Sequence, residues 1–151
     1  MLDSMQTIYS GDVSNFHLVT KRYGNEILHL LEIIGPVGFE ERNLVYQKTL
    51  ELNQTDKYFC VLSNLDRHAN NLSFHDITVL DRLLEDGGIK LFYGATVSVD
   101  VGYSSVVKLA NVNMEQTGLD GECISTGEME SAEEFIIDRL NEHTSPAEKS
   151  I

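Results

Sequence analysis

The chain has 151 residues, 42% of them apolar, so it has the size and apolar content of one ordinary domain with its own core. It carries 24 acidic and 11 basic residues, a formal net charge of -13, and the basic residues are scattered along the chain. Such a charge repels phosphate backbones and anionic lipid surfaces, which argues against nucleic-acid binding and peripheral membrane binding.

The two cysteines, Cys60 and Cys123, lie inside apolar segments, where a free thiol packs as a small hydrophobe. Their spacing matches neither a zinc motif nor a disulfide scaffold. The N-terminus has no basic start or apolar run of a signal peptide, and no apolar stretch approaches the roughly 18 residues of a spanning helix. We therefore expect a cytoplasmic protein without membrane insertion.

The first part of the chain predicts a β-hairpin. Residues 1–12 are polar and unpatterned, and we expect them to form a flexible terminus. Two extended apolar runs, over residues 16–23 and 26–34, flank Gly24-Asn25, a two-residue step typical of a hairpin. Gly35-Pro36 ends the second run, because proline cannot donate a hydrogen bond to a sheet.

The rest of the chain alternates between apolar strands and amphipathic helices. Two capping boxes, Ser73 with Asp76 and Ser131 with Glu134, mark helix starts, and Asp100 serves as the N-cap of the helix between them. Periodicity and these caps predict strands over residues 58–62, 89–99 and 122–125, and helices over residues 40–54, 73–86, 102–112 and from 131 onward.

This order predicts an α/β fold. An N-terminal hairpin followed by right-handed βαβ crossovers gives a five-stranded mixed sheet with about four helices packed on it. No linker or low-complexity tract divides the chain, so we expect a single domain over residues 13–143. Residues 144–151 have no helical stripe and are expected to be flexible, like residues 1–12.

Three segments carry a resemblance to a known family. They are a strand that runs out into a loop, a strand that leads to the third helix, and a capped last helix: Val61-Leu62-Ser63-Asn64-Leu65-Asp66, Gly94-Ala95-Thr96-Val97-Ser98-Val99 and Glu130-Ser131-Ala132-Glu133-Glu134-Phe135. With the element order, they make the chain resemble the SpoIIAA-like proteins, a group related to the STAS domain of anti-sigma-factor antagonists and sulfate transporters. The resemblance implies a SpoIIAA-like or STAS-like fold.

In the phosphorylatable members of that group, a serine at the start of the second helix lies in an Asp-Ser-Ser/Thr-Gly motif. Ser73 is nearest to this position in topology, but its neighbours, Asn70-Asn71-Leu72-Ser73-Phe74-His75, lack the Asp, the second hydroxyl residue and the Gly. A helix N-terminus favours a phosphate, and the same serine is also an ordinary cap. Relatives without the motif resemble general binding modules, some with an apolar cavity beside the sheet.

No pattern of catalytic strength is present. His68 and His75 lie near Asp66 and Asp76, but this set lacks the ligand count and spacing of a metal motif. No serine lies in a nucleophile elbow, and no glycine pair has the spacing of a phosphate-binding loop. We therefore expect no enzymatic activity, no metal and no cofactor, although an enzyme with an unrecognised site on the loops is a third alternative.

The carboxyl edge of the parallel strands is the expected binding site, because ligands of open α/β sheets bind there. The residues expected to line it are Asp66, His68, Ser73, Asp100, Tyr103 and Ser104. The leading hypothesis is a non-enzymatic cytoplasmic regulatory module that acts through a protein partner and is modulated at the loop before the second helix. The alternative is a carrier of a small apolar or lipid-like ligand held between the helices and the sheet.

Self-association is compatible with this reading. If the second strand of the hairpin lay at the edge of the sheet, it would expose Ile27, Leu31 and Ile33 and need a cover. A homodimer would provide that cover.

Overall fold

A computed structural model describes residues 2–99 and 103–144, with Tyr103 described by its backbone only. The described residues form a short 3-10 helix, η1, six strands and four α-helices. In chain order the elements are η1 (Leu2–Ser4), β1 (Gln6–Val13), β2 (Phe16–Tyr23), β3 (Glu26–Ile33), α1 (Phe39–Leu52), β4 (Lys57–Asn64), α2 (Phe74–Asp86), β5 (Leu91–Ser98), α3 (Tyr103–Gln116), β6 (Asp120–Thr126) and α4 (Met129–His143).

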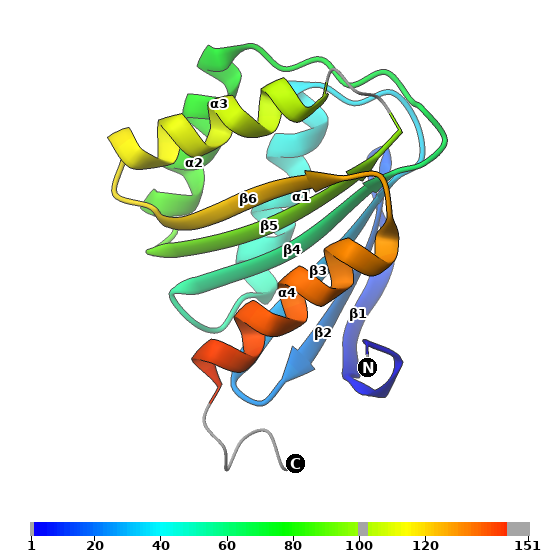
Figure 1. The fold of residues 1–151 in the computed structure, drawn as a ribbon, viewed down its shortest axis with the longest axis vertical. Coiled ribbons are helices and arrows are strands. Elements are labelled where there is room, and N and C mark those ends of the chain that lie inside the picture. The colour runs from blue at the N-terminus through cyan, green and yellow to red at the C-terminus, as the bar shows by residue number, and fades with distance from the viewer. Residues whose placement is uncertain (1, 100–102, 145–151) are drawn as a thin grey trace.

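The six strands form one mixed sheet in the order β1-β2-β3-β4-β5-β6. β1, β2 and β3 pair antiparallel, and β3 to β6 pair parallel. Each crossover leads to the next strand along the sheet, so connections of the same hand leave α1, α2 and α3 on one face. α4 follows the last strand and covers the other face (Figure 1).

The prediction of an α/β fold with a mixed sheet and four helices is confirmed, but the prediction of five strands is wrong. Residues 6–13 form β1, so the segment 1–12 is not a flexible terminus. Its apolar residues are few, yet Leu2 and Met5 are buried under α4, and Tyr9 packs against the core on the opposite face. An edge strand with one side toward water needs only this sparse pattern.

The expectation that the second strand of the hairpin could lie at the edge of the sheet is wrong. Ile27, Leu31 and Ile33 are all buried, because β3 pairs with β2 on one side and with β4 on the other. The two outer strands of the sheet are β1 and β6. The three residues thus offer no surface to a second copy.

Some of the predicted turns, helix ends and caps agree with the structure, and others do not. The hairpin turn at Gly24, with a φ of 62°, and the end of α2 at Gly87 are as predicted. The last helix starts two residues earlier than expected, at Met129 after Glu128, so Ser131 lies inside the helix and caps nothing. The predicted cap Asp100 lies outside the described residues.

Gly121 fixes the pairing of β5 with β6. It lies opposite Phe92 and has a φ of 121°, a conformation that L side chains rarely adopt. A Cβ atom at this position would lie 1.9 Å from the carbonyl oxygen of Phe92. Only glycine allows the two strands to approach in this way.

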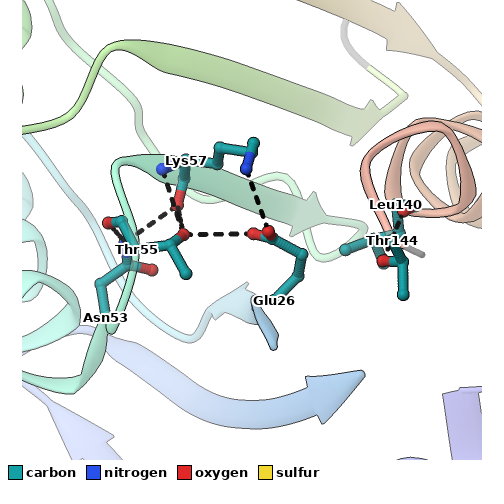
Figure 2. Close-up of polar contacts among 6 residues, drawn as sticks. All are labelled: Glu26, Asn53, Thr55, Lys57, Leu140 and Thr144. Carbon is teal, nitrogen blue, oxygen red and sulfur yellow. Dashed lines mark hydrogen bonds and ion pairs between the residues drawn. The ribbon is translucent and has the colours of Figure 1, made fainter. Parts of the chain in front are cut away.

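A polar cluster closes the loop between α1 and β4 (Figure 2). The buried carboxylate of Glu26 accepts a hydrogen bond from Thr55 Oγ1 at 3.1 Å and forms an ion pair with Lys57 Nζ at 3.2 Å. Asn53, the C-cap of α1, donates to the carbonyl oxygens of Thr55 and Lys57, both at 2.9 Å. The side chains of Glu26, Asn53, Thr55 and Lys57 thus all have partners.

His29 extends this cluster into the core. Its Nε2 lies 3.0 Å from Asn53 Oδ1, and its Nδ1 lies 3.0 Å from Thr20 Oγ1. The amide oxygen of Asn53 can only accept, so Nε2 carries the proton and Nδ1 accepts from the threonine hydroxyl. Burial lowers the pKa of His29 to about 4, which keeps the ring neutral. His29 is therefore a satisfied core residue.

Candidate functional site

Asp66, His68 and Ser73 all lie on the loop between β4 and α2. The buried side chain of Asn64 folds the start of this loop back on itself: Nδ2 donates to the carbonyl oxygen of His68, and Oδ1 accepts from the His68 N–H, both at 3.1 Å. Arg67 turns the chain with a φ of 57°. The first four residues of the loop are therefore fixed by one asparagine.

The second half of the loop is tied to the segment before α1. Val37 donates from its N–H to the carbonyl of Ala69 at 2.8 Å, and its own carbonyl accepts from Asn71 at 3.1 Å. Arg42 of α1 donates to the side-chain oxygen of Asn70. These bonds hold together the segments that follow β3 and β4, at the carboxyl edge of the sheet.

Ser73 is the N-cap of α2, as its capping box predicted. Its Oγ accepts from the N–H of Asp76 at 3.1 Å, and its own N–H donates to Asp76 Oδ2 at 3.0 Å. The hydroxyl is exposed, so it is open to modification. A phosphate on it would stand next to the Asp76 carboxylate, and like charges repel at that distance.

The other predicted site residues belong to a different element. Tyr103 is the first residue of α3, and Ser104 lies exposed in its first turn. Asp100 lies outside the described residues. The structure thus brings Asp66, His68 and Ser73 onto one loop and puts Ser104 on the helix that follows the next strand.

A feature that sequence reasoning missed is a row of exposed apolar side chains along the carboxyl edge. Ile34, Leu65 and Val99 each come immediately after the last residue of a strand, β3, β4 and β5 respectively. Their exposed fractions are 40%, 51% and 43%. Glu32 pairs with Ser63, and Asn64 pairs with Ser98, so the three strands end at the same level of the sheet. The three residues that follow these strand ends therefore leave the sheet at neighbouring positions. We call them the carboxyl-edge row.

The carboxyl-edge row has acidic neighbours. The exposed Glu32 precedes Ile34 by two residues, and Asp66 follows Leu65 directly. In the sequence, the only sign of the row is one apolar residue after each strand. The pairing registers of the strands are needed to see that these residues lie near one another.

The opposite face of the sheet contains a cavity. It has a volume of about 80 Å³ and lies between the central strands and α1, α2 and α3. Its wall is mostly apolar, with Leu31 and Phe92 from the sheet and Leu80 and Ala110 from the helices. The wall also includes the buried Arg42 of α1, whose positive charge opposes that of a bound cation. Sequence patterns gave no indication of its size or lining.

Asp81 of α2 is the carboxyl group in the cavity wall, and it is 9% exposed. Its Oδ2 accepts from Asn113 Nδ2 of α3 at 2.5 Å, and Asn113 Oδ1 lies 3.0 Å from the hydroxyl of Thr78. Burial raises the pKa of Asp81 to about 6, although the bond from Asn113 acts in the opposite direction. Within the described residues, no protein donor reaches its Oδ1.

Both cysteines also line the cavity, as neutral thiols. Burial raises the pKa of Cys60 to about 12 and that of Cys123 well above its ordinary value. Both lie in register with Gly94 of the strand between them, so their Cα atoms are about 10 Å apart by strand spacing. That separation is too large for a disulfide, and protonated thiols are poor nucleophiles.

Two further properties hold for the part of the chain that the structure describes. It contains no group of three or more His, Cys, Asp or Glu side chains that could hold a metal ion. None of its helices is both long enough and apolar enough to cross a membrane.

Comparisons with protein-family models, with curated proteins and with solved structures found no match. The class that fold and site define is therefore an α/β protein with a six-stranded mixed sheet, an exposed apolar row at its carboxyl edge and a cavity under three helices.

Proposed function

We propose that the protein is a non-enzymatic regulatory module of the cytoplasm that binds a protein partner through the carboxyl-edge row. The observation that carries this proposal is the alignment of Ile34, Leu65 and Val99 across three neighbouring strands. Single exposed apolar residues are ordinary, but a contiguous group marks an interaction surface. A partner-binding role is also what the resemblance to SpoIIAA-like proteins implies.

The negative charge of the chain indicates which kind of partner would bind to the row. The chain has a net charge of -13, and Glu32 and Asp66 flank the row. A complementary partner has an apolar side chain for the row with Lys or Arg beside it, because opposite potentials steer encounter and suppress wrong partners. We therefore propose a basic, partly apolar protein segment as the occupant.

The rigid loop supports the same proposal. The side chain of Asn64 and the backbone of Val37 hold the loop around Leu65 in place through hydrogen bonds to its backbone. A surface that is already ordered loses little conformational entropy when a partner binds. Leu65, at the middle of the row and 51% exposed, is the residue whose truncation should cost most affinity.

The test compares two leucines that are both about half exposed. Protein purified from its own host is cross-linked and the partner contacts are mapped for wild type, Leu65→Ser and Leu109→Ser, the latter on α3 with 43% exposure. We expect Leu65→Ser to lose the partner and Leu109→Ser to keep it, with the cross-linked segment rich in Lys or Arg. Equal binding by both variants would show that the row is the wrong surface.

Regulation is proposed at the loop before α2. A phosphate on Ser73 would oppose the Asp76 carboxylate and weaken the capping box, which would loosen the loop beside Leu65. Intact mass under denaturing conditions should then show an excess of about 80 Da, one phosphoryl group. If Ser73→Glu and Asp66→Ala leave partner binding unchanged, this loop has no regulatory role.

The second candidate function is a carrier of a small apolar ligand. The cavity under α1, α2 and α3 favours it, because it lies between the helices and the sheet. An apolar cavity of about 150 Å³ holds a molecule of the size of benzene. At about 80 Å³, the present cavity fits something smaller and leaves no space for a lipid chain. Native mass spectrometry of gently purified protein should show a stoichiometric ligand if the protein is a carrier.

A further inference from the structure

We propose that Asp81 makes the cavity a binding site for a small, compact organic amine. The inference rests on the second candidate function and gives its ligand a chemical class. The amine would direct its ammonium group at the carboxyl of Asp81 and its hydrocarbon part at the apolar wall formed by residues such as Leu80 and Ala110.

The first argument is the incomplete hydrogen bonding of Asp81. An ionised carboxylate offers about four acceptor sites, and Asn113 fills one of them, at Oδ2. Within the described residues no protein donor reaches Oδ1, and Asp81, 9% exposed, lines the cavity. Oδ1 is therefore open to the cavity and can accept a hydrogen bond from a ligand.

The second argument is the contrast with three other buried polar side chains of the core. His29, Glu26 and Tyr58 are buried polar groups, and each of them has partners for its polar atoms. Replacing Asp81 by an apolar residue would remove a buried charge without loss of volume. Polar groups that violate the packing rules of the core are expected at functional sites.

The third argument is charge and size. The negative net charge of the chain raises the local concentration of cations around it. An ammonium donates three hydrogen bonds, so it can satisfy Oδ1 in a way that an alcohol or a hydrocarbon cannot match. The volume of about 80 Å³ restricts the hydrocarbon part to a few carbon atoms. Ethylamine is a probe of this kind, and ethanol is its uncharged match.

The experiment is a methyl-detected NMR titration of the full chain with ethylamine and, separately, ethanol. Shifts at the methyl groups of Leu80 and Ala110 report the cavity itself. We expect the amine to bind at least tenfold more tightly than the alcohol, since a hydrogen bond to a charged group contributes about 1.5–3 kcal/mol. The preference should disappear in Asp81→Asn and persist in Thr78→Val, which removes the hydroxyl that lies 3.0 Å from both Asn113 Oδ1 and the Phe74 carbonyl oxygen and leaves the contact of Asn113 with Asp81 in place.

The remaining outcomes separate the two claims. Equal affinity for amine and alcohol would overturn the role of Asp81 and leave the carrier function standing. No response from the cavity methyl groups to either probe, in wild type and in Asp81→Asn, would overturn both. Shifts confined to the acidic surface would mean that the amine binds outside the cavity, which also refutes the proposal.

Discussion

Two buried polar regions of this protein are built in opposite ways. The cluster around His29 joins β2, β3 and the end of α1, and both ring nitrogens of the histidine have a hydrogen-bond partner. The pair of Asp81 with Asn113 joins α2 and α3 and leaves one carboxylate oxygen without a protein donor within the described residues. The polar atoms of the first region are paired within the protein, which stabilises the fold. The second region has a carboxylate oxygen at the cavity wall that accepts no hydrogen bond from the described residues.

The largest expected effect comes from breaking the satisfied region. Asn53→Ala removes the acceptor of His29 and the donor to the carbonyl oxygens of Thr55 and Lys57 (Figure 2). Leaving several buried groups unpaired should lower the free energy of unfolding by about 3 kcal/mol. Urea unfolding measures the loss, and Asn43→Ala, on the outer side of the same helix, should change stability by less than about 0.5 kcal/mol.

The second prediction concerns acid. The pKa of His29 is about 4 in the folded protein and near 6.5 when unfolded, so the unfolded state binds the proton first. Stability should therefore fall as the pH drops from about 6.5 to 4, by about 3 kcal/mol in total. His29→Gln keeps a donor and an acceptor but does not titrate. Urea unfolding of both proteins should show a steeper decline for wild type in this window, and parallel curves would contradict the prediction.

The third prediction has the opposite sign. Asp81 has its pKa raised to about 6, above the ordinary value of 3.8, so its contribution to stability is complete below about 3.8 and is lost as the pH rises through 6. Asp81→Asn should therefore raise the free energy of unfolding at pH 7 by about 1–2 kcal/mol, and the gain should vanish at pH 4. The exposed Asp86→Asn on the same helix serves as the control and should give no such gain.

The smallest expected effect comes from Thr78, whose hydroxyl contacts Asn113 and so helps to hold the pair of Asp81 and Asn113 in place. Thr78→Val keeps the shape of the side chain but removes the hydroxyl next to Asn113. The loss should be about 0.5–1 kcal/mol by urea unfolding, since a single hydrogen bond contributes about that much. A loss as large as that of Asn53→Ala would mean that the Asp81 region is as tightly interlocked as the His29 region, and the contrast between them would disappear.

The two capping boxes of the sequence show that a local signal can be right at one helix and wrong at another. Ser73 with Asp76 predicted the start of α2, because both partners of a capping box lie within four residues. The same pattern at Ser131 predicted a false start, because α4 begins at Met129 without a side-chain cap. Burial of the helix face then determines the boundary more strongly than the cap does.

The site depends on contacts that the sequence pattern does not contain. Asp81 and Asn113 are 32 residues apart, and nothing in their local patterns connects them. The carboxyl-edge row likewise requires the pairing registers of three strands. The sequence pattern does not predict β1 either, because an edge strand with one side in water needs few apolar residues. In each case tertiary pairing, and not periodicity, defines the feature.

The close approach of β5 and β6 at Gly121 also constrains how this chain can change over time. Any side chain at that position would collide with the backbone of Phe92, and backbone atoms cannot be repacked as side chains can. Position 121 should therefore accept only glycine, while the exposed residues around it vary freely. In divergent relatives, an invariant glycine one residue into the last strand would be a lasting mark of common descent.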